Sequence, residues 1–110
     1  MSTKMKNIAK SEMLRLTDQI QYLEGQVVSK TLAQNEHVSL TLFAFDKGEE
    51  ISTHASGGDA MVTVLDGTGK FTISGKEHLL TKDETIVMPA GEPHAVFGQE
   101  RFKMLLTVVF

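Results

Sequence analysis

From residue 26 to the C-terminus, the sequence is a series of short apolar-alternating segments separated by turns that contain glycine or proline. In the stretch HVSLTLFAF at 37–45, Val38, Leu40 and Leu42 occupy alternate positions with other residues between them. Because successive side chains of a β-strand point to opposite faces of a sheet, this spacing predicts a strand. Turn signals recur between such stretches, at DKGEE, DGTG, SGKE, TKDE and PAGEP. Short strands at this spacing predict an all-β sandwich or barrel.

The first 25 residues have a different pattern. Leu16, Ile20 and Leu23 are spaced by four and three residues and would share one face of a helix. No other part of the sequence has this helical spacing. We therefore expect residues 1–25 to form an N-terminal arm with a short helix, packed on a β-domain of residues 26–110.

Length and composition exclude several classes of protein. The chain has 110 residues, the usual size of a single domain. It contains no cysteine, which rules out a disulfide framework and thiolate metal sites. A net charge of −3 argues against a nucleic-acid partner, since such partners favour a basic surface.

The sequence also gives no sign of a membrane partner. Its longest unbroken apolar run, LFAF at 42–45, is far too short to cross a bilayer. The first ten residues, MSTKMKNIAK, lack the apolar core of a signal peptide. We therefore expect a cytoplasmic protein.

The four histidines are the main candidates for chemistry. His37 and His78 lie near strand ends or turns and are expected at the surface. His54 and His94 differ, since each follows a turn-rich segment and precedes an apolar strand. Side chains from several strands meet inside a small barrel, so two imidazoles from separate strands can converge there.

At these two histidines the sequence resembles the cupin family over roughly residues 26–110. The positions in register with the family's two motifs are Gly48, His54 and Gly67 in the first, and Pro89, Gly91 and His94 in the second. The resemblance implies a small single-domain cupin, a jelly-roll β-barrel with a short helical N-terminal arm.

The resemblance also implies a divalent metal ion such as Fe, Mn, Ni or Zn, but the ligand set is incomplete. Ser56 stands where the family has a second histidine, and Ala60 where it has a glutamate, so only His54 and His94 remain of four ligands. Asp59 is a candidate third ligand, provided that a bulge at Gly57–Gly58 turns it inward. On this interpretation the protein is a metal-dependent enzyme of the oxygenase or isomerase type.

The alternative is a metal-free pocket for a small-molecule ligand. Ser56 and Ala60 are smaller than the ligands they replace and leave space beside the two imidazoles. Val62 is expected on the same face as Ala60, with Met88 nearby. These residues predict an apolar cavity with a few polar groups, as in many ligand sites. The two histidines can also be simple structural residues, and the sequence identifies no ligand, metal or reaction.

The outer face of the barrel predicts a homodimer. On the strand at 59–66, Met61 and Leu65 would point outward, and a face in contact with water should not carry two large apolar residues. The chain ends in the apolar stretch MLLTVVF, which we expect to leave an uncovered sheet edge. The expected interface consists of the outer sheet face, the arm and the C-terminal strand.

Overall fold

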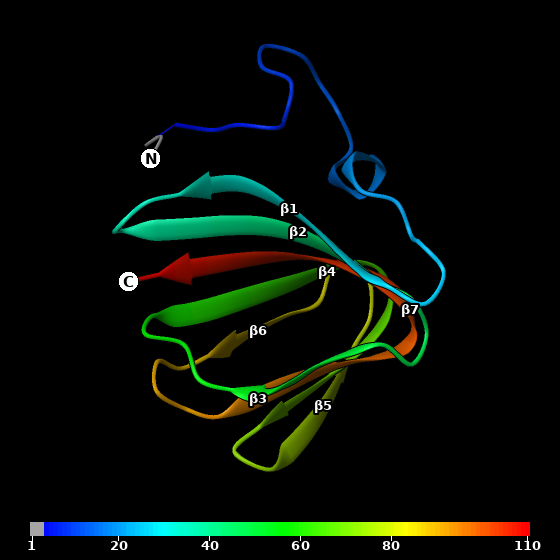
Figure 1. The fold of residues 1–110 in the computed structure, drawn as a ribbon, viewed down its shortest axis with the longest axis vertical. Coiled ribbons are helices and arrows are strands. Elements are labelled where there is room, and N and C mark those ends of the chain that lie inside the picture. Colours follow the sequence, from blue (N-terminus) through cyan, green and yellow to red (C-terminus); the bar gives the residue numbers. More distant parts are fainter. Residues whose placement is uncertain (1–3) are drawn as a thin grey trace.

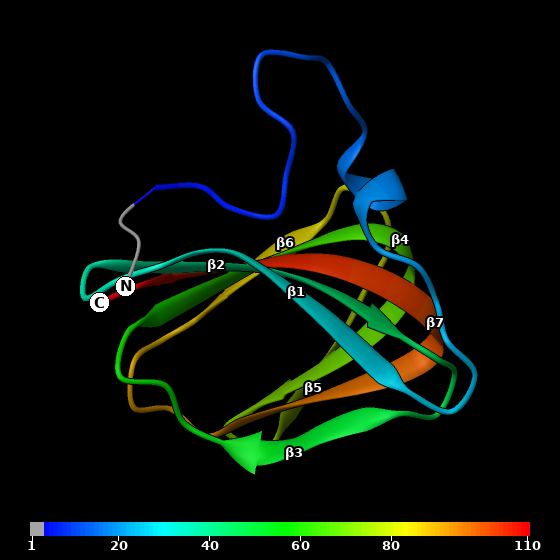
Figure 2. The same ribbon diagram turned by 45° about the horizontal axis from the view of Figure 1, so that its top comes forward.

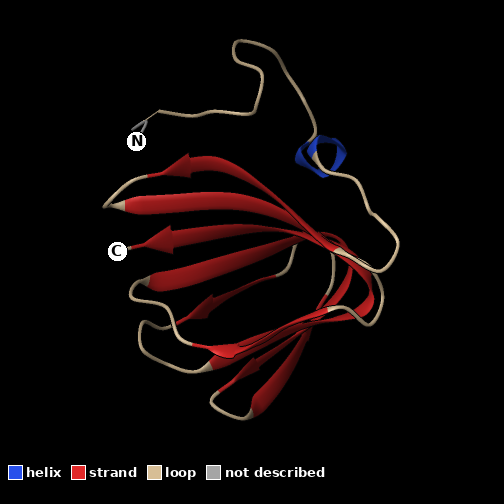
Figure 3. Ribbon diagram, in the orientation of Figure 1, coloured by secondary structure: helices blue, strands red, loops and turns tan. Residues whose placement is uncertain are grey.

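The computed structural model describes residues 4–110, which form strands and a single helical turn (Figures 1 and 3). The elements are the 3-10 helix η1 (Leu16–Gln19) and the strands β1 (Val27–Gln34), β2 (Val38–Phe45), β3 (Glu50–His54), β4 (Asp59–Ile73), β5 (Lys76–Leu80), β6 (Thr85–Met88) and β7 (His94–Val109). The all-β prediction is confirmed.

All strand pairs are antiparallel, and the two long strands β4 and β7 form the centre of the sheet. The C-terminal half of β7 pairs with β2, and β1 extends that layer. The N-terminal half of β7 pairs with β3 instead. On its other side β4 pairs with β6 near its start and with β5 near its end. Each long strand therefore belongs to two layers, which meet where β7 turns at the right of Figure 1.

The bend depends on Gly67. The β4–β7 register shifts on both sides of this residue. Gly67 has a φ of +74°, and a Cβ atom there would lie 1.7 Å from the carbonyl oxygen of Arg101. Only glycine tolerates both the left-handed conformation and this close approach. The bend folds one continuous sheet into a barrel.

The interior of the barrel near the bend is filled by aromatic and aliphatic side chains. Phe102 stacks on Phe45 with ring centroids 4.6 Å apart and meets the edge of Phe71 at 5.9 Å. All three phenylalanines are fully buried. Further from the bend the interior contains smaller or more flexible side chains, and there a cavity remains.

The N-terminal arm lies outside the barrel, above the layer of β1, β2, β7 and β4 (Figure 2). Its helical part is only the four-residue turn η1. Of the expected helical face, Ile20 is buried against Leu42 and Ala44, whereas Leu23 is exposed. So short a helix has little stability of its own, and packing on the sheet determines its course. No helix among the described residues is long and apolar enough to span a membrane.

Lys103 fastens the arm to the barrel. It interrupts the apolar sequence of β7, and its side chain is buried under the arm. There the ammonium donates a hydrogen bond to the carbonyl of Thr17 at 2.6 Å and lies over the ring of Tyr22. The hydroxyl of Tyr22 in turn donates to Asp66 on β4. The arm therefore converts an otherwise exposed apolar sheet face into a second small core.

The expectation of an uncovered C-terminal edge is wrong. β7 lies between β2 and β4 and is hydrogen-bonded on both sides, so its end is not free to pair with another chain. Leu65 packs against the second core under the arm. Met61 remains 42% exposed and lies opposite Val87, which is 51% exposed.

Met61 and Val87 form an exposed apolar pair across β4 and β6, and the partly buried Leu40 and Thr107 continue this row across β2 and β7. Leu40, Thr107, Met61 and Val87 are successive cross-strand partners in β2, β7, β4 and β6. Neighbouring exposed apolar side chains such as Met61 and Val87 are often found at interfaces. The homodimer stays a prediction, with this row as its centre.

Sedimentation at micromolar concentration tests the dimer. We expect twice the 12.1 kDa mass of one chain. Met61→Lys should yield single chains, because a buried unpaired charge opposes association. Leu79→Lys on β5, outside the row but 60% exposed, is the matched control and should leave the dimer intact. A mass of 12.1 kDa for the unsubstituted chain would contradict the prediction.

Candidate functional site

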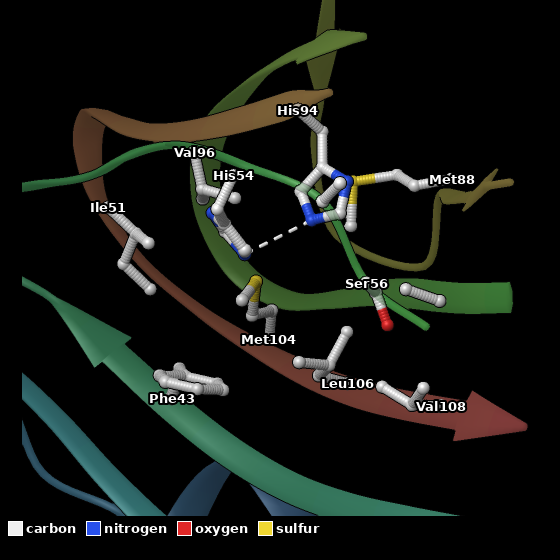
Figure 4. Close-up of a pocket in the computed structure, with 12 residues that line it drawn as sticks. Phe43, Ile51, His54, Ser56, Met88, His94, Val96, Met104, Leu106 and Val108 are labelled. Atoms are coloured by element: carbon white, nitrogen blue, oxygen red, sulfur yellow. Dashed lines mark hydrogen bonds between the residues drawn. The ribbon is translucent and has the colours of Figure 1, made fainter. Parts of the chain in front are cut away.

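A cavity of about 310 Å³ occupies the barrel interior away from the bend (Figure 4). Strands β2, β3, β4, β6 and β7 and the loop after β3 contribute to it. The lining residues are Phe43, Ile51, His54, Ala55, Ser56, Ala60, Met88, His94, Val96, Met104, Leu106 and Val108. Five of the six residues predicted to line a pocket are among them.

A bulge in β3 brings His54 into the cavity. Ile51 pairs with Val96 and His54 pairs with His94, so two residues of β3 lie opposite one residue of β7. In a regular strand, residues three apart point to opposite faces. The bulge reverses this alternation, and both Ile51 and His54 line the cavity.

The two imidazoles meet edge to face across the β3–β7 pair. Their Nε2 atoms lie 3.2 Å apart, and the ring planes are inclined by 71°. The Nδ1 atom of His54 lies 2.8 Å from the carbonyl oxygen of Ser52, and that of His94 lies 3.3 Å from the carbonyl oxygen of Glu92. A carbonyl oxygen only accepts hydrogen bonds, so we assign the hydrogen of each neutral ring to Nδ1. In a neutral ring this leaves Nε2 as an acceptor.

The environments of the two rings differ. His94 is 3% exposed, whereas His54 lies at the exposed rim. Burial lowers the pKa of His94 below its ordinary value, and the neighbouring His54 lowers this pKa further. Both effects disfavour the charged imidazolium. His94 is therefore a neutral imidazole at pH values where a free histidine would begin to take up a proton.

Ala60, Met88 and Ser56 lie where the pocket prediction placed them. Ala60 and Met88 are cross-strand partners, each 2% exposed. The carbonyl of Ser56 accepts a hydrogen bond from Gly91 N at 2.9 Å, and its hydroxyl accepts one from Gly58 N at 3.2 Å. Ser56 thus holds the loop at 55–58 against the loop after β6.

The structure differs from the prediction at Val62. This side chain points inward but is fully buried within the apolar core and does not line the cavity. It lies two residues nearer the bend than Ala60, where the interior is filled. Sequence analysis missed seven apolar lining residues: Phe43, Ile51, Ala55, Val96, Met104, Leu106 and Val108. Alternation in β7 marks three of these as one face, but only strand pairing brings that face opposite His54.

Asp59 does not join the histidines. Its carboxylate accepts a hydrogen bond from Ala90 N at 2.9 Å, and its side chain is exposed. Alternation holds at the start of β4, with Asp59 outward and Ala60 inward. Within residues 4–110, no three His, Cys, Asp or Glu side chains are grouped so that they could hold a metal ion.

Comparison with known proteins shows several similarities. The Cupin domain family matches residues 41–110. A conserved protein of unknown function from Streptococcus pyogenes is 44% identical, with a TM-score of 0.94 over 99% of this chain and 95% of that one. A cupin superfamily protein from Desulfitobacterium hafniense is 33% identical, with a TM-score of 0.93 over 97% of this chain and 98% of that one.

One characterised enzyme shares the fold alone. Salicylate 1,2-dioxygenase from Pseudoaminobacter salicylatoxidans is 15% identical, with a TM-score of 0.71 over 84% of this chain and 27% of that one. Among curated protein sequences, none matches the chain.

The lowered pKa of His94 predicts a loss of stability in mild acid. The folded state binds the proton more weakly than the unfolded chain, whose histidines titrate near about 6.5. The free energy of unfolding should therefore fall as the pH drops below that value, until the folded-state pKa is reached. Urea denaturation at a series of pH values measures this.

His94→Gln should reduce this fall, because glutamine does not titrate. His37→Gln is the control, since His37 is exposed outside the barrel and its loss should leave the profile unchanged. An identical pH profile for the wild type and His94→Gln would contradict the prediction.

Proposed function

Because the chain belongs to the cupin superfamily, we propose that it is a small cupin whose barrel cavity binds a small molecule beside His54 and His94. The observation that carries this proposal is the cavity of about 310 Å³ into which the two imidazoles converge. Ligand sites in proteins are concave and mostly apolar, with a few polar groups that orient the ligand.

The lining fits this description. Nine of the twelve lining residues are apolar, and only His54, Ser56 and His94 are polar. The volume lies near the lower end of the range for small-molecule sites, about 300–1,000 Å³. The replacement of two family ligands by Ser56 and Ala60 contributes to this space, since neither side chain reaches far into the barrel. These features support a compact, largely apolar ligand with one polar group.

A metal-dependent enzyme is the second candidate function, and the distance between the two Nε2 atoms favours it. The two Nε2 atoms lie 3.2 Å apart. A metal ion about 2.1 Å from each of them would form an N–metal–N angle of about 100°. That angle suits two adjacent metal ligands. The donor set does not fit a catalytic ion, however, because such sites commonly have three protein ligands and the described residues offer no third one near the pair. We therefore favour the metal-free pocket.

Metal analysis separates the two candidates. After incubation with Fe²⁺, Mn²⁺, Ni²⁺ or Zn²⁺ and dialysis, we expect far less than one ion per chain, because two neutral imidazoles bind weakly. Elemental analysis of the wild type and His54→Ala measures the retained ion. One ion per chain that disappears in His54→Ala would support the enzyme and contradict the metal-free pocket.

Thermal melting with small aromatic and branched-chain compounds, toluene among them, tests ligand binding. A compound that binds only the folded protein stabilises it by about 2.7 kcal/mol at one hundred times its Kd. Ala60→Leu should abolish the stabilisation, because the added side chain fills the cavity. Met61→Leu, on the next residue but on the outer face, is the matched control and should preserve it. Equal responses of the two variants would contradict binding in the cavity.

A further inference from the structure

The polar end of the cavity presents hydrogen-bond acceptors and no donor from its imidazoles. Both Nδ1 hydrogens are used by the carbonyls of Ser52 and Glu92, so both Nε2 atoms of the neutral rings carry lone pairs. These atoms lie 3.2 Å apart, and with both hydrogens assigned to Nδ1 this contact contains no hydrogen. Two facing acceptors in an apolar setting repel each other. A ligand that supplies one hydrogen relieves this repulsion.

The spacing of the two acceptors favours a single shared hydrogen. For an oxygen atom about 2.8 Å from each Nε2 atom, the Nε2···O···Nε2 angle would be about 70°. That angle is much narrower than the angle between two N–H bonds of an amine or an amide. One O–H group directed between the nitrogens therefore fits better than an –NH₂ or ammonium group that donates to each separately.

The lack of charged side chains in the lining disfavours a ligand with a carboxylate or an ammonium group. None of the described residues that line the cavity is Asp, Glu, Lys or Arg, so a charged ligand would have no counter-ion among them. A carboxylate also has only acceptor atoms and would add a third acceptor to the existing two. An ammonium would be buried without a compensating negative charge. A neutral hydroxyl has neither disadvantage.

We propose that the ligand of this cavity is a small apolar alcohol or phenol whose hydroxyl hydrogen is shared by the Nε2 atoms of His54 and His94. This inference rests on the proposed function and adds the chemical class of the ligand. In Figure 4 the dashed line marks the contact between the two Nε2 atoms, and the hydroxyl would lie beside this line on the cavity side. Met104, Leu106 and Val108 form part of the apolar wall for the rest of the molecule.

The test compares phenol, its methyl ether anisole, and benzoate at pH 8, where free imidazoles are neutral. Titrations are followed by NMR at the methyl groups of Met88 and Met104, with the exposed Met13 and Met61 as internal controls. We expect phenol to bind about fivefold or more tightly than anisole, as a single hydrogen bond provides. Benzoate should bind more weakly than phenol.

A variant tests the role of the imidazoles. His54→Phe should bring the affinity for phenol down to that for anisole, whereas His37→Phe, outside the barrel, should keep the difference. The nitrogen chemical shifts of the wild-type imidazoles provide a measurement that needs no substitution. We expect hydrogen on Nδ1 of both neutral rings, and hydrogen on Nε2 of either ring would overturn the inference.

The outcomes distinguish this inference from the proposed function. Equal binding of phenol and anisole at Met88 and Met104, or tighter binding of benzoate, would overturn the hydroxyl class and leave the pocket in place. The proposal that the cavity binds a small molecule would be overturned by two results together. These are no response at either methyl group to any of the three compounds, and no stabilisation by any compound in the melting experiment.

Discussion

The rest of the structure depends on the pairing of β4 with β7 through a sharp bend. The two strands pair from Asp59 with Val109 to Ile73 with His94, and the register shifts only near Gly67. At that point the backbone of β4 comes so close to the carbonyl of Arg101 that no side chain fits. Beyond the bend, each strand joins a second layer with new partners. The site exists because β7 leaves the layer of β2 and continues to β3, carrying His94 to the other side of the cavity.

The two histidines converge because of local irregularity as well as overall topology. A regular β3 would place Ile51 and His54 on opposite faces, and the bulge between them lets both reach the interior. Backbone carbonyls then hold each ring by its Nδ1 atom and direct Nε2 toward the other ring. In the cupin family these two positions belong to a four-ligand metal site. Here Ser56 and Ala60 line the cavity beside the two imidazoles, and most of the other lining residues are apolar.

The layer formed by β1, β2, β7 and β4 has apolar side chains on both faces. For this reason the sequence pattern alone does not show which face of these strands is exposed to solvent. Phe45 faces the barrel interior while Leu42 faces the arm, and both are fully buried. Lys103 is buried with them because the arm supplies a carbonyl acceptor and an aromatic ring. A strand buried on both faces loses the clean alternation of apolar and polar residues. From sequence alone such a strand resembles one with an exposed apolar face, which is why the outward Met61 and Leu65 were interpreted as part of a dimer interface.

The sequence by itself determined the all-β class, the strand β2, the family and five residues of the cavity, because alternation and turn residues are local properties. The turn expected at DGTG is instead the bend inside the continuous strand β4. His54 and His94 were identified from the motifs around them, and Ala60 from the alternation that also keeps Asp59 outside. Only the tertiary structure decided that the C-terminal strand is central, that Val62 belongs to the filled part of the core, and that Met104 and Leu106 face the histidines. Each of these depends on which strands pair and in what register. Pairing joins residues far apart in the chain, and no local pattern contains that information.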